Sequence, residues 1–258
     1  MDRDERVIAI IQARMGSKRL PGKVLRVINQ RTMLGWVVER TKIAKEVDEV
    51  IVATTTNKND DPIVAYCKHH EYKYVRGSEY DVLDRFCEVL RKFPAEVVVR
   101  ITADCPFVDP VVIDKVVWEY FHADPPADFV ANRLPPPWDR TFPVGLDTEV
   151  VSTEALSEAW SKATKQHQRE HVLPYIYEHP QKFNILLVDA EDDYSDLRWT
   201  VDTEKDLKLV KEIAGHFEDR INFSWMEILD VYHQNPALKK INNDVNQKSA
   251  LDVDDQLL

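Results

Sequence analysis

Cationic side chains are concentrated in one glycine-bearing segment near the N-terminus, residues 11–23 (IQARMGSKRLPGK). Four cations lie within ten residues: Arg14, Lys18, Arg19 and Lys23. Two glycines, a serine and a proline interrupt regular structure, so backbone N–H groups can point at an anion while the Arg and Lys side chains neutralise it. The segment predicts a polyphosphate site, and a solvated basic turn is the alternative.

The spacing of this segment differs from two common phosphate-binding motifs. Five residues separate Gly16 from Gly22, whereas the P-loop pattern has four, and Lys23 is followed by Val24 rather than Ser or Thr. The dinucleotide fingerprint G-x-G-x-x-G is excluded because Lys18 stands two residues after Gly16.

Charge and composition limit the classes of partner. Residues 6–38 carry seven Arg and Lys and no Asp or Glu, although the whole chain has a net charge of −11. An anionic protein argues against generic binding to DNA, RNA or an anionic membrane, so a local site for a small anion is favoured. Cys67, Cys87 and Cys105 form no C-x-x-C pair, which is typical of a reducing cytoplasm. The charged start is unlike a signal peptide, and no apolar run approaches the ~18 residues that span a bilayer. The sequence predicts a soluble cytoplasmic protein.

Apolar runs and helical repeats alternate through residues 7–121. Buried strands are predicted at Val7–Ile11, Val47–Ala53, Tyr72–Val75 and Val97–Ile101, and helices at Thr32–Ala44, Asp61–His70, Tyr80–Lys92 and Asp109–Phe121. Four strand–helix repeats predict a mostly parallel sheet with helices on both faces. Ligands of such sheets bind beyond the carboxyl ends of the strands. There the sequence places the basic segment, Thr54–Asn57, Arg76 and Asp104.

Proline runs interrupt this alternation in the second half of the chain. Further strands are predicted at Phe129–Ala131, within Phe142–Val150, at Phe183–Val188 and at Leu197–Val201, and helices at Thr153–Ala163, His167–Tyr177 and after Asp202. We expect residues 1–240 to form a single domain, in which an inserted lobe at about 133–196 covers the acceptor side and contributes to a homodimer. Residues 241–258, rich in Asn, Asp, Gln and Ser, are expected to form a flexible tail.

Eight segments resemble, in order, those of sugar nucleotidyltransferases. They are the basic segment, ATTTN at 53–57, RG at 76–77, DVLDRF at 81–86, RITADCP at 100–106, GLDTEV at 145–150, REHV at 169–172 and RWTVDT at 198–203. The sequence is most similar to the acylneuraminate and Kdo cytidylyltransferases, and within them to the branch named for spore coat polysaccharide biosynthesis protein F. The resemblance covers about residues 6–240. It implies a Rossmann-like three-layer α/β/α nucleotidyltransferase fold with an inserted lobe.

The resemblance also implies the reaction, in which a sugar hydroxyl attacks the α-phosphate of a nucleoside triphosphate and pyrophosphate leaves. Charge on the phosphates must be neutralised, so positioning and electrostatics carry most of the catalysis. The residues assigned to the nucleotide near the basic segment are Ala13, Arg14, Gly16, Ser17, Arg19 and Lys23. Arg14, Lys23 and Asp104 are the expected catalytic residues. Asp104 and Asp202, each just past a predicted strand, are expected to share a Mg²⁺ ion, and turn or helix-cap roles are the alternatives.

Base and acceptor recognition are assigned to other strand ends. Candidates for the base are Thr54, Asn57, Arg76, Asp81 and Arg100. Arg100 lies in a buried run and needs a partner, either a ligand or an acid such as Asp104. Candidates for the acceptor are Asp147, Glu149, His167, Arg169, Glu170 and His171. Arg169 suits the carboxylate of an acidic keto-sugar, or it forms a salt-bridged helix face with Glu170.

Three other classes of protein fit the sequence less well. The run HQREH at 167–171 matches the H-x-x-E-H pattern of zinc peptidases, but that function leaves the basic segment unexplained. A glycosyltransferase that uses a nucleotide sugar usually has an Asp-x-Asp pair, whereas Asp104 is followed by Cys105-Pro106. A non-catalytic nucleotide-binding protein would lack one of the basic or acidic anchors. The favoured interpretation is a Mg²⁺-dependent cytidylyltransferase that uses CTP to make cell-surface polysaccharide precursors.

Overall fold

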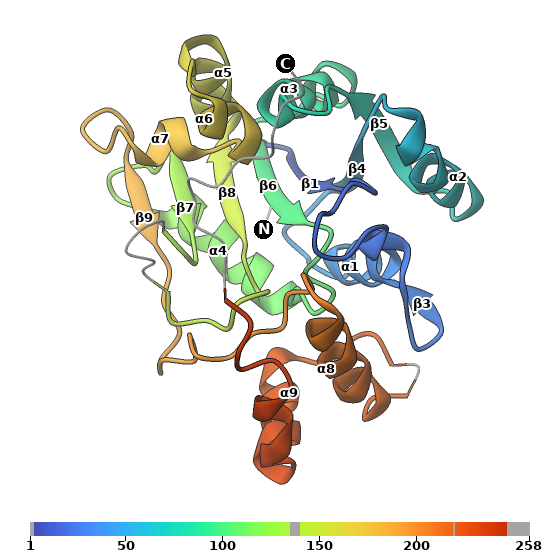
Figure 1. Cartoon of the computed structure of the whole chain (residues 1–258). Coiled ribbons are helices and arrows are strands. Elements are labelled where there is room, and N and C mark those ends of the chain that lie inside the picture. The colour runs from blue at the N-terminus through green and yellow to red at the C-terminus, as the bar shows by residue number, and fades with distance from the viewer. Residues whose placement is uncertain (1–2, 135–139, 219, 247–258) are drawn as a thin grey trace.

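A seven-stranded sheet forms the centre of the molecule (Figure 1). The computed structural model describes residues 3–134, 140–218 and 220–246. The strand order is β5 (Lys73–Gly77), β4 (Glu49–Thr55), β1 (Val7–Gln12), β6 (Val97–Thr102), β8 (Glu149–Ser152), β7 (Phe129–Ala131) and β9 (Ile185–Leu187). Strands β5, β4, β1 and β6 are parallel, and β8 pairs antiparallel with both β6 and β7. The predicted mostly parallel sheet is confirmed.

Helices cover both faces of the sheet, which confirms the three-layer fold. Alternate residues of β1 supply the two sides of the core: Val7, Ala9 and Ile11 belong to one apolar cluster, and Ile8 and Ile10 to the other. The first cluster takes side chains from α1 (Met33–Thr41), α2 (Asp61–His69), α4 (Pro110–His122), α8 (Glu204–Gly215) and α9 (Trp225–Gln234). The second takes side chains from α3 (Val82–Lys92), α5 (Thr153–Lys162) and α7 (Pro174–Tyr177). A parallel strand buried on both faces has the continuous apolar sequence that β1 shows.

The strand register brings four polar residues to the same edge of the sheet. Gln12 at the end of β1 lies opposite Ala53 of β4 and Thr102 of β6. Thr54 lies opposite Arg76 on the neighbouring pair of strands. The segments that follow these strands therefore leave the sheet side by side, at the edge where the sequence predicts a ligand site.

Two elements of the second half differ from the predictions. The predicted helix over 167–177 is two short helices, α6 (Gln166–His171) and α7, because Val172 adopts a positive φ of 75° between them. The predicted strand over 197–201 is wrong: this extended segment forms a single bridge, between Arg198 and Val144. Gly145 turns the chain with φ of 109°, and the N–H of Leu146, which would continue the ladder, donates to the carbonyl oxygen of Pro143 at 3.2 Å instead.

The region predicted as an inserted lobe contributes directly to the central sheet through β8 and β9. A short hairpin, β2 (Val27–Ile28) with β3 (Arg31–Thr32), follows the basic segment. Short 3-10 helices span Lys23–Leu25, Lys58–Asp60 and Pro236–Lys240. In the segment predicted as a tail, Asn242 is buried and donates to the carbonyl oxygen of Arg198 at 3.1 Å, while residues 247–258 lie outside the described residues.

One buried cation connects the C-terminal part to the sheet. Arg40 of α1 donates to the carbonyl oxygens of Val108, Ile221 and Phe223. Burial lowers the pKa of Arg40 to about 10, although Asp109 nearby opposes the shift. Within the described part of the chain, no helix combines the length and apolar character needed to cross a membrane.

Candidate active site

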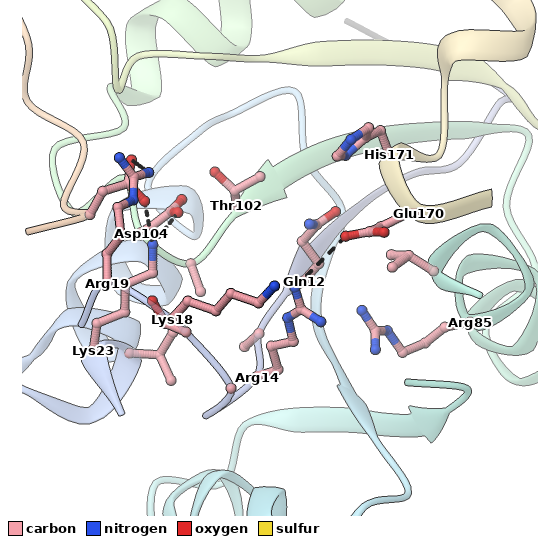
Figure 2. A pocket seen from close by; sticks show the side chains of 17 residues that line it. Gln12, Arg14, Lys18, Arg19, Lys23, Arg85, Thr102, Asp104, Glu170 and His171 are labelled. Carbon is pink, nitrogen blue, oxygen red and sulfur yellow. Dashed lines mark hydrogen bonds and ion pairs between the residues drawn. The ribbon is translucent and has the colours of Figure 1, made fainter. Parts of the chain in front are cut away.

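A pocket of about 260 Å³ opens at the carboxyl ends of β1 and β6 (Figure 2). Its walls come from the basic segment, the turn after β6, α3, α6 and Asp202. The lining residues are Gln12, Ala13, Arg14, Gly16, Ser17, Lys18, Arg19, Lys23, Val24, Val82, Arg85, Thr102, Ala103, Asp104, Glu170, His171 and Asp202. The site is therefore assembled from segments that lie far apart in the sequence.

Local hydrogen bonds fix the shape of the basic segment. Gly22, in the left-handed conformation with φ of 67°, donates its N–H to the carbonyl oxygen of Met15 at 3.0 Å and closes the loop. Ser17 Oγ accepts from the N–H of Leu20 at 3.3 Å. The N–H of Met15 donates to Asp60 Oδ1 at 2.6 Å, which anchors the loop to the neighbouring strand end. A loop held in this way presents its cations without further ordering.

Lys23 connects the loop to two carboxylates. Its Nζ lies 2.7 Å from Asp104 Oδ2 and 2.9 Å from Asp202 Oδ1, and it donates to the carbonyl oxygen of Val201 at 3.0 Å. Burial lowers the pKa of Lys23, but the attraction of Asp104 and Asp202 outweighs it, so the pKa is raised. Two carboxylates from separate segments thus converge on one cation.

Asp202 is the most heavily paired acid of the pocket. Its Oδ2 lies 2.8 Å from Arg19 Nη2 and 2.6 Å from Arg198 Nη2. Burial raises the pKa of Asp202, but Lys23, Arg19 and Arg198 together lower it to about 2. Arg198 in turn contacts the buried Asp206, which caps the first turn of α8 together with Thr203. Sequence reasoning missed Arg198, because a spacing of four residues indicates an ion pair within a helix and residues 198–202 are not helical.

Helix α6 forms the opposite wall. Glu170 and His171 line the pocket there, and Glu170 Oε1 lies 4.0 Å from Arg14 Nη2. His167, the other histidine of the H-x-x-E-H run, contacts Glu178 Oε1 at 2.5 Å instead. No group of three His, Cys, Asp or Glu residues suited to a metal occurs among the described residues. The two histidines therefore have different surroundings, and the geometry does not support a zinc peptidase.

The pocket gathers the residues predicted for phosphate and metal and two of the residues predicted for the acceptor, Glu170 and His171. Those that line it are Ala13, Arg14, Gly16, Ser17, Arg19, Lys23, Asp104, Glu170, His171 and Asp202. Those that do not line it are Thr54, Asn57, Arg76, Asp81, Arg100, Asp147, Glu149 and Arg169. A Cβ at Gly16 would meet no atom within 4 Å, so the backbone there is open to an incoming ligand.

Two of the residues predicted for the base, Arg76 and Asp81, are held by protein contacts close to their strand ends. Arg76 donates to the carbonyl oxygens of Thr55 at 2.7 Å and of Asn57 at 2.8 Å. Asp81 caps α3 by accepting from the N–H of Asp84, and its other oxygen pairs with Arg169. The hydroxyl oxygen of Thr54 is buried and has no hydrogen-bond partner among the described residues.

Two of the acceptor candidates belong to a buried ionic network beside the pocket. Arg100 donates to Gln12 Oε1 at 3.0 Å and pairs with Glu149, which supplies the partner that its burial requires. Asp147 pairs with Arg140 at 2.8 Å and with Arg133 at 3.1 Å. Burial raises the pKa of Asp147, but the two arginines outweigh this effect, so the pKa is lowered. Gln12 connects this network to the floor of the pocket.

Arg85 is a pocket residue that sequence reasoning did not single out. It belongs to the DVLDRF segment, and its position on α3 lies within the apolar face of that helix, three residues after Val82 and four before Val89. A charged residue inside an apolar helical stripe was the available signal, because such a charge needs a specific partner.

Comparison with known proteins agrees with this geometry. The cytidylyltransferase family model matches residues 8–244. An uncharacterized protein of Methanocaldococcus jannaschii is 41% identical over 97% of this chain and 100% of its own length. Spore coat polysaccharide biosynthesis protein SpsF of Bacillus subtilis is 32% identical over 89% of this chain and 95% of its own. Among solved structures, a cytidylyltransferase from Leptospira borgpetersenii superposes with a TM-score of 0.86 at 31% identity, covering 95% of this chain and 100% of that one.

Proposed function

This chain belongs to the cytidylyltransferase family, and we propose that it transfers the cytidylyl group of CTP to an acidic keto-sugar, with Mg²⁺ bound, to make precursors of cell-surface polysaccharide. The observation that carries this proposal is the cluster of Arg14, Lys18, Arg19 and Lys23 in one pocket with Asp104 and Asp202. The name of the Bacillus subtilis relative supports the polysaccharide role.

The cations suit the electrostatic demands of the transfer. The oxygen of a sugar hydroxyl forms a bond to the α-phosphorus and its proton passes to water, while the bond between that phosphorus and the bridging oxygen breaks and pyrophosphate leaves with the electron pair. Negative charge grows on the leaving group, so Arg14, Arg19 and Lys23 stabilise the transition state more than the ground state. The hydrogen-bonded loop holds these side chains in place before the nucleotide arrives.

Asp104 and Asp202 fit a divalent cation. Their oxygens Oδ2 and Oδ1 both contact the Lys23 ammonium, at 2.7 and 2.9 Å, so the two carboxylates already converge on one positive centre. Magnesium is commonly bound by one or two carboxylates together with substrate phosphates. The bound ion would neutralise phosphate charge and orient the phosphates. Because the ion would neutralise Asp104 and Asp202, the flexible Lys23 side chain could leave these carboxylates and pair with phosphate oxygens.

The acceptor is assigned to the wall formed by α6. His171 lines the pocket there, and Arg169 is two residues away, in a contact with Asp81 that a sugar carboxylate could replace. We retain Asp147 and Glu149 as outer residues that support this wall through the network of Arg100 and Gln12. We also retain the predictions of a homodimer and of a cytoplasmic location, for which size-exclusion chromatography with light scattering and cell fractionation are the tests.

Pyrophosphate release measures the proposed activity directly. CTP, UTP, ATP and GTP are each supplied with a panel of acidic keto-sugars and neutral sugars, with and without Mg²⁺. We expect release with CTP and an acidic sugar in the presence of Mg²⁺, and its loss when EDTA is added. Release with none of the four triphosphates, together with binding of a nucleotide sugar, would instead indicate a glycosyltransferase.

A further inference from the structure

The two carboxylate oxygens of Asp202 face different partners. Oδ1 accepts from Lys23 Nζ at 2.9 Å, and the same ammonium lies 2.7 Å from Asp104 Oδ2, so Oδ1 is the oxygen turned toward the second carboxylate of the pocket. Oδ2 pairs with Arg19 Nη2 at 2.8 Å and with Arg198 Nη2 at 2.6 Å. The orientation of the Asp202 carboxylate therefore depends on the cations that hold Oδ2.

Arg198 differs from the other two cations in its distance from the nucleotide. Arg19 and Lys23 line the pocket and are assigned to the triphosphate, whereas Arg198 is not among the described residues that line it. Figure 2 shows Arg19 and Lys23 gathered with Asp104 at one end of the pocket. A nucleotide that draws these two side chains to its phosphates leaves Arg198 to hold Asp202 Oδ2.

A buried acid fixes Arg198 in turn. Arg198 Nε lies 3.1 Å from Oδ1 of Asp206, which is 0% exposed and belongs to the first turn of α8. Asn242 Nδ2 donates to the same oxygen at 2.8 Å and to the carbonyl oxygen of Arg198 at 3.1 Å. The guanidinium is planar and rigid, so pairing through Nε with one acid and through Nη2 with another fixes its orientation. Arg198 therefore connects Asp206 to Asp202 in a defined geometry.

Capping of α8 accounts for only one oxygen of Asp206. Its Oδ2 accepts from the N–H groups of Asp202 and Thr203, at 3.0 and 2.9 Å, and from the Thr203 hydroxyl, as in a capping box. Its Oδ1 instead accepts from Arg198 and Asn242, which a helix cap does not require. Asp206 thus holds both the backbone of Asp202 and the arginine that orients the Asp202 side chain.

We propose that Arg198 and Asp206 are positioning residues, which keep Asp202 Oδ1 available to the divalent ion while the nucleotide is bound. The inference rests on the proposed function, because it takes Asp202 as a metal ligand. Loss of a partner that orients a metal-binding side chain typically costs ten- to hundredfold in metal affinity or activity. Neither residue has to touch the ion or the nucleotide to have this effect.

Two substitutions that change the local charge in opposite directions test this role. Arg198→Met removes a cation beside Asp202, so charge alone would strengthen metal binding, and Asp206→Asn removes an anion, so charge alone would weaken it. Loss of positioning weakens metal binding in both variants. Asp206→Asn keeps one side-chain oxygen for the cap of α8, and in Arg198→Met the cap is unchanged, so both variants should fold.

Titration calorimetry of CTP in excess Mg²⁺ and in EDTA gives two affinities, whose ratio measures the coupling between metal and nucleotide. Binding of Mg²⁺ to free CTP is the same for every protein and cancels when the ratios are compared. We expect each variant to lower the ratio about tenfold or more, while binding in EDTA shows that the variant is folded. A defect in folding alone would weaken both affinities equally and leave the ratio unchanged.

Arg26→Met is the matched control, because it removes the same charge near the start of α8 from an exposed pair with Glu204. Its ratio should stay within about twofold of wild type. A ratio that rises or stays unchanged in either Arg198→Met or Asp206→Asn overturns the inference and leaves the proposed function intact. A wild-type ratio of one would contradict the use of Mg²⁺ in the proposed function and would overturn both.

Discussion

Replacing Lys23 by Met should destabilise the nucleotide-free protein and make its stability depend on divalent metal. The substitution removes the cation that lies between Asp104 and Asp202 and keeps most of the apolar stem. Removing one partner of a buried ion pair costs about 3–5 kcal/mol. The lower end, about 3 kcal/mol, applies because Asp202 keeps Arg19 and Arg198. For a domain of this size that loss lowers the melting temperature by about 6–12 °C.

Manganese should restore the stability of the Lys23→Met variant, because Asp104 and Asp202 no longer have the Lys23 ammonium between them and can bind a divalent ion there. A metal at a hundred times its dissociation constant returns about 2.7 kcal/mol. Thermal unfolding with and without MnCl₂ measures the effect, and Mn²⁺ titration followed by electron paramagnetic resonance counts the bound ions. Arg26→Met is the control. It also removes one positive charge, but Arg26 lies three residues after Lys23 and forms an exposed ion pair with Glu204. The reasoning fails if Lys23→Met melts with the wild type, or if Mn²⁺ stabilises both proteins equally.

Substitutions at Asp104, Gly145 and Asp202 test other parts of the structure. Asp104→Asn should abolish pyrophosphate release while CTP still binds in the absence of metal; wild-type turnover would remove Asp104 from the mechanism. Gly145→Ala should cost at least about 2 kcal/mol, because φ is 109° and the added Cβ would lie 2.6 Å from the backbone nitrogen of Thr200; urea unfolding measures this against Gly215→Ala, whose Cβ meets nothing within 4 Å. The pKa of Asp202, lowered to about 2 from its usual 3.8, should give about 2 kcal/mol of stability above pH 4 that is lost toward pH 2. The stability difference between wild type and Asp202→Asn should therefore shrink from pH 5 to pH 3, and a constant difference would refute that pKa.

The basic segment and strands β1, β4, β5 and β6 were predictable because each is a local property of the chain, whereas the short hairpin of β2 and β3 was not predicted. Continuous apolar runs mark strands buried on both faces, and glycine with clustered cations marks an anion-binding loop. The extended segment at 197–201 has the same apolar character as a strand, but its pairing ends at the turn around Gly145, which lies more than fifty positions earlier. Periodicity within one segment carries no information about the partner that limits its ladder.

The roles of Arg85 and Arg198 depend on tertiary contacts. The sequence alone does not indicate which charged residues make those contacts. Both residues lie in segments that carry the family resemblance, yet neighbouring charged residues in those segments were equally plausible candidates. Asp81, for example, caps a helix and pairs with Arg169 outside the pocket, while Arg85, four residues later, lines it. Burial without a carboxylate partner distinguishes a ligand-facing arginine from a structural one, and burial becomes known only when the helix is placed on the sheet.

Charge pairing explains how an anionic protein keeps a dense cationic loop in place. Lys23 and Arg19 contact Asp202, and Arg198 connects that aspartate to Asp206 at the start of α8. Without such pairs, the mutual repulsion of the cations would favour an extended loop. A triphosphate that binds alone would be repelled by these carboxylates, and a divalent ion that binds alone would be repelled by the arginines and Lys23. The arrangement therefore favours binding of the metal and the nucleotide together, because each neutralises the charges that oppose the other.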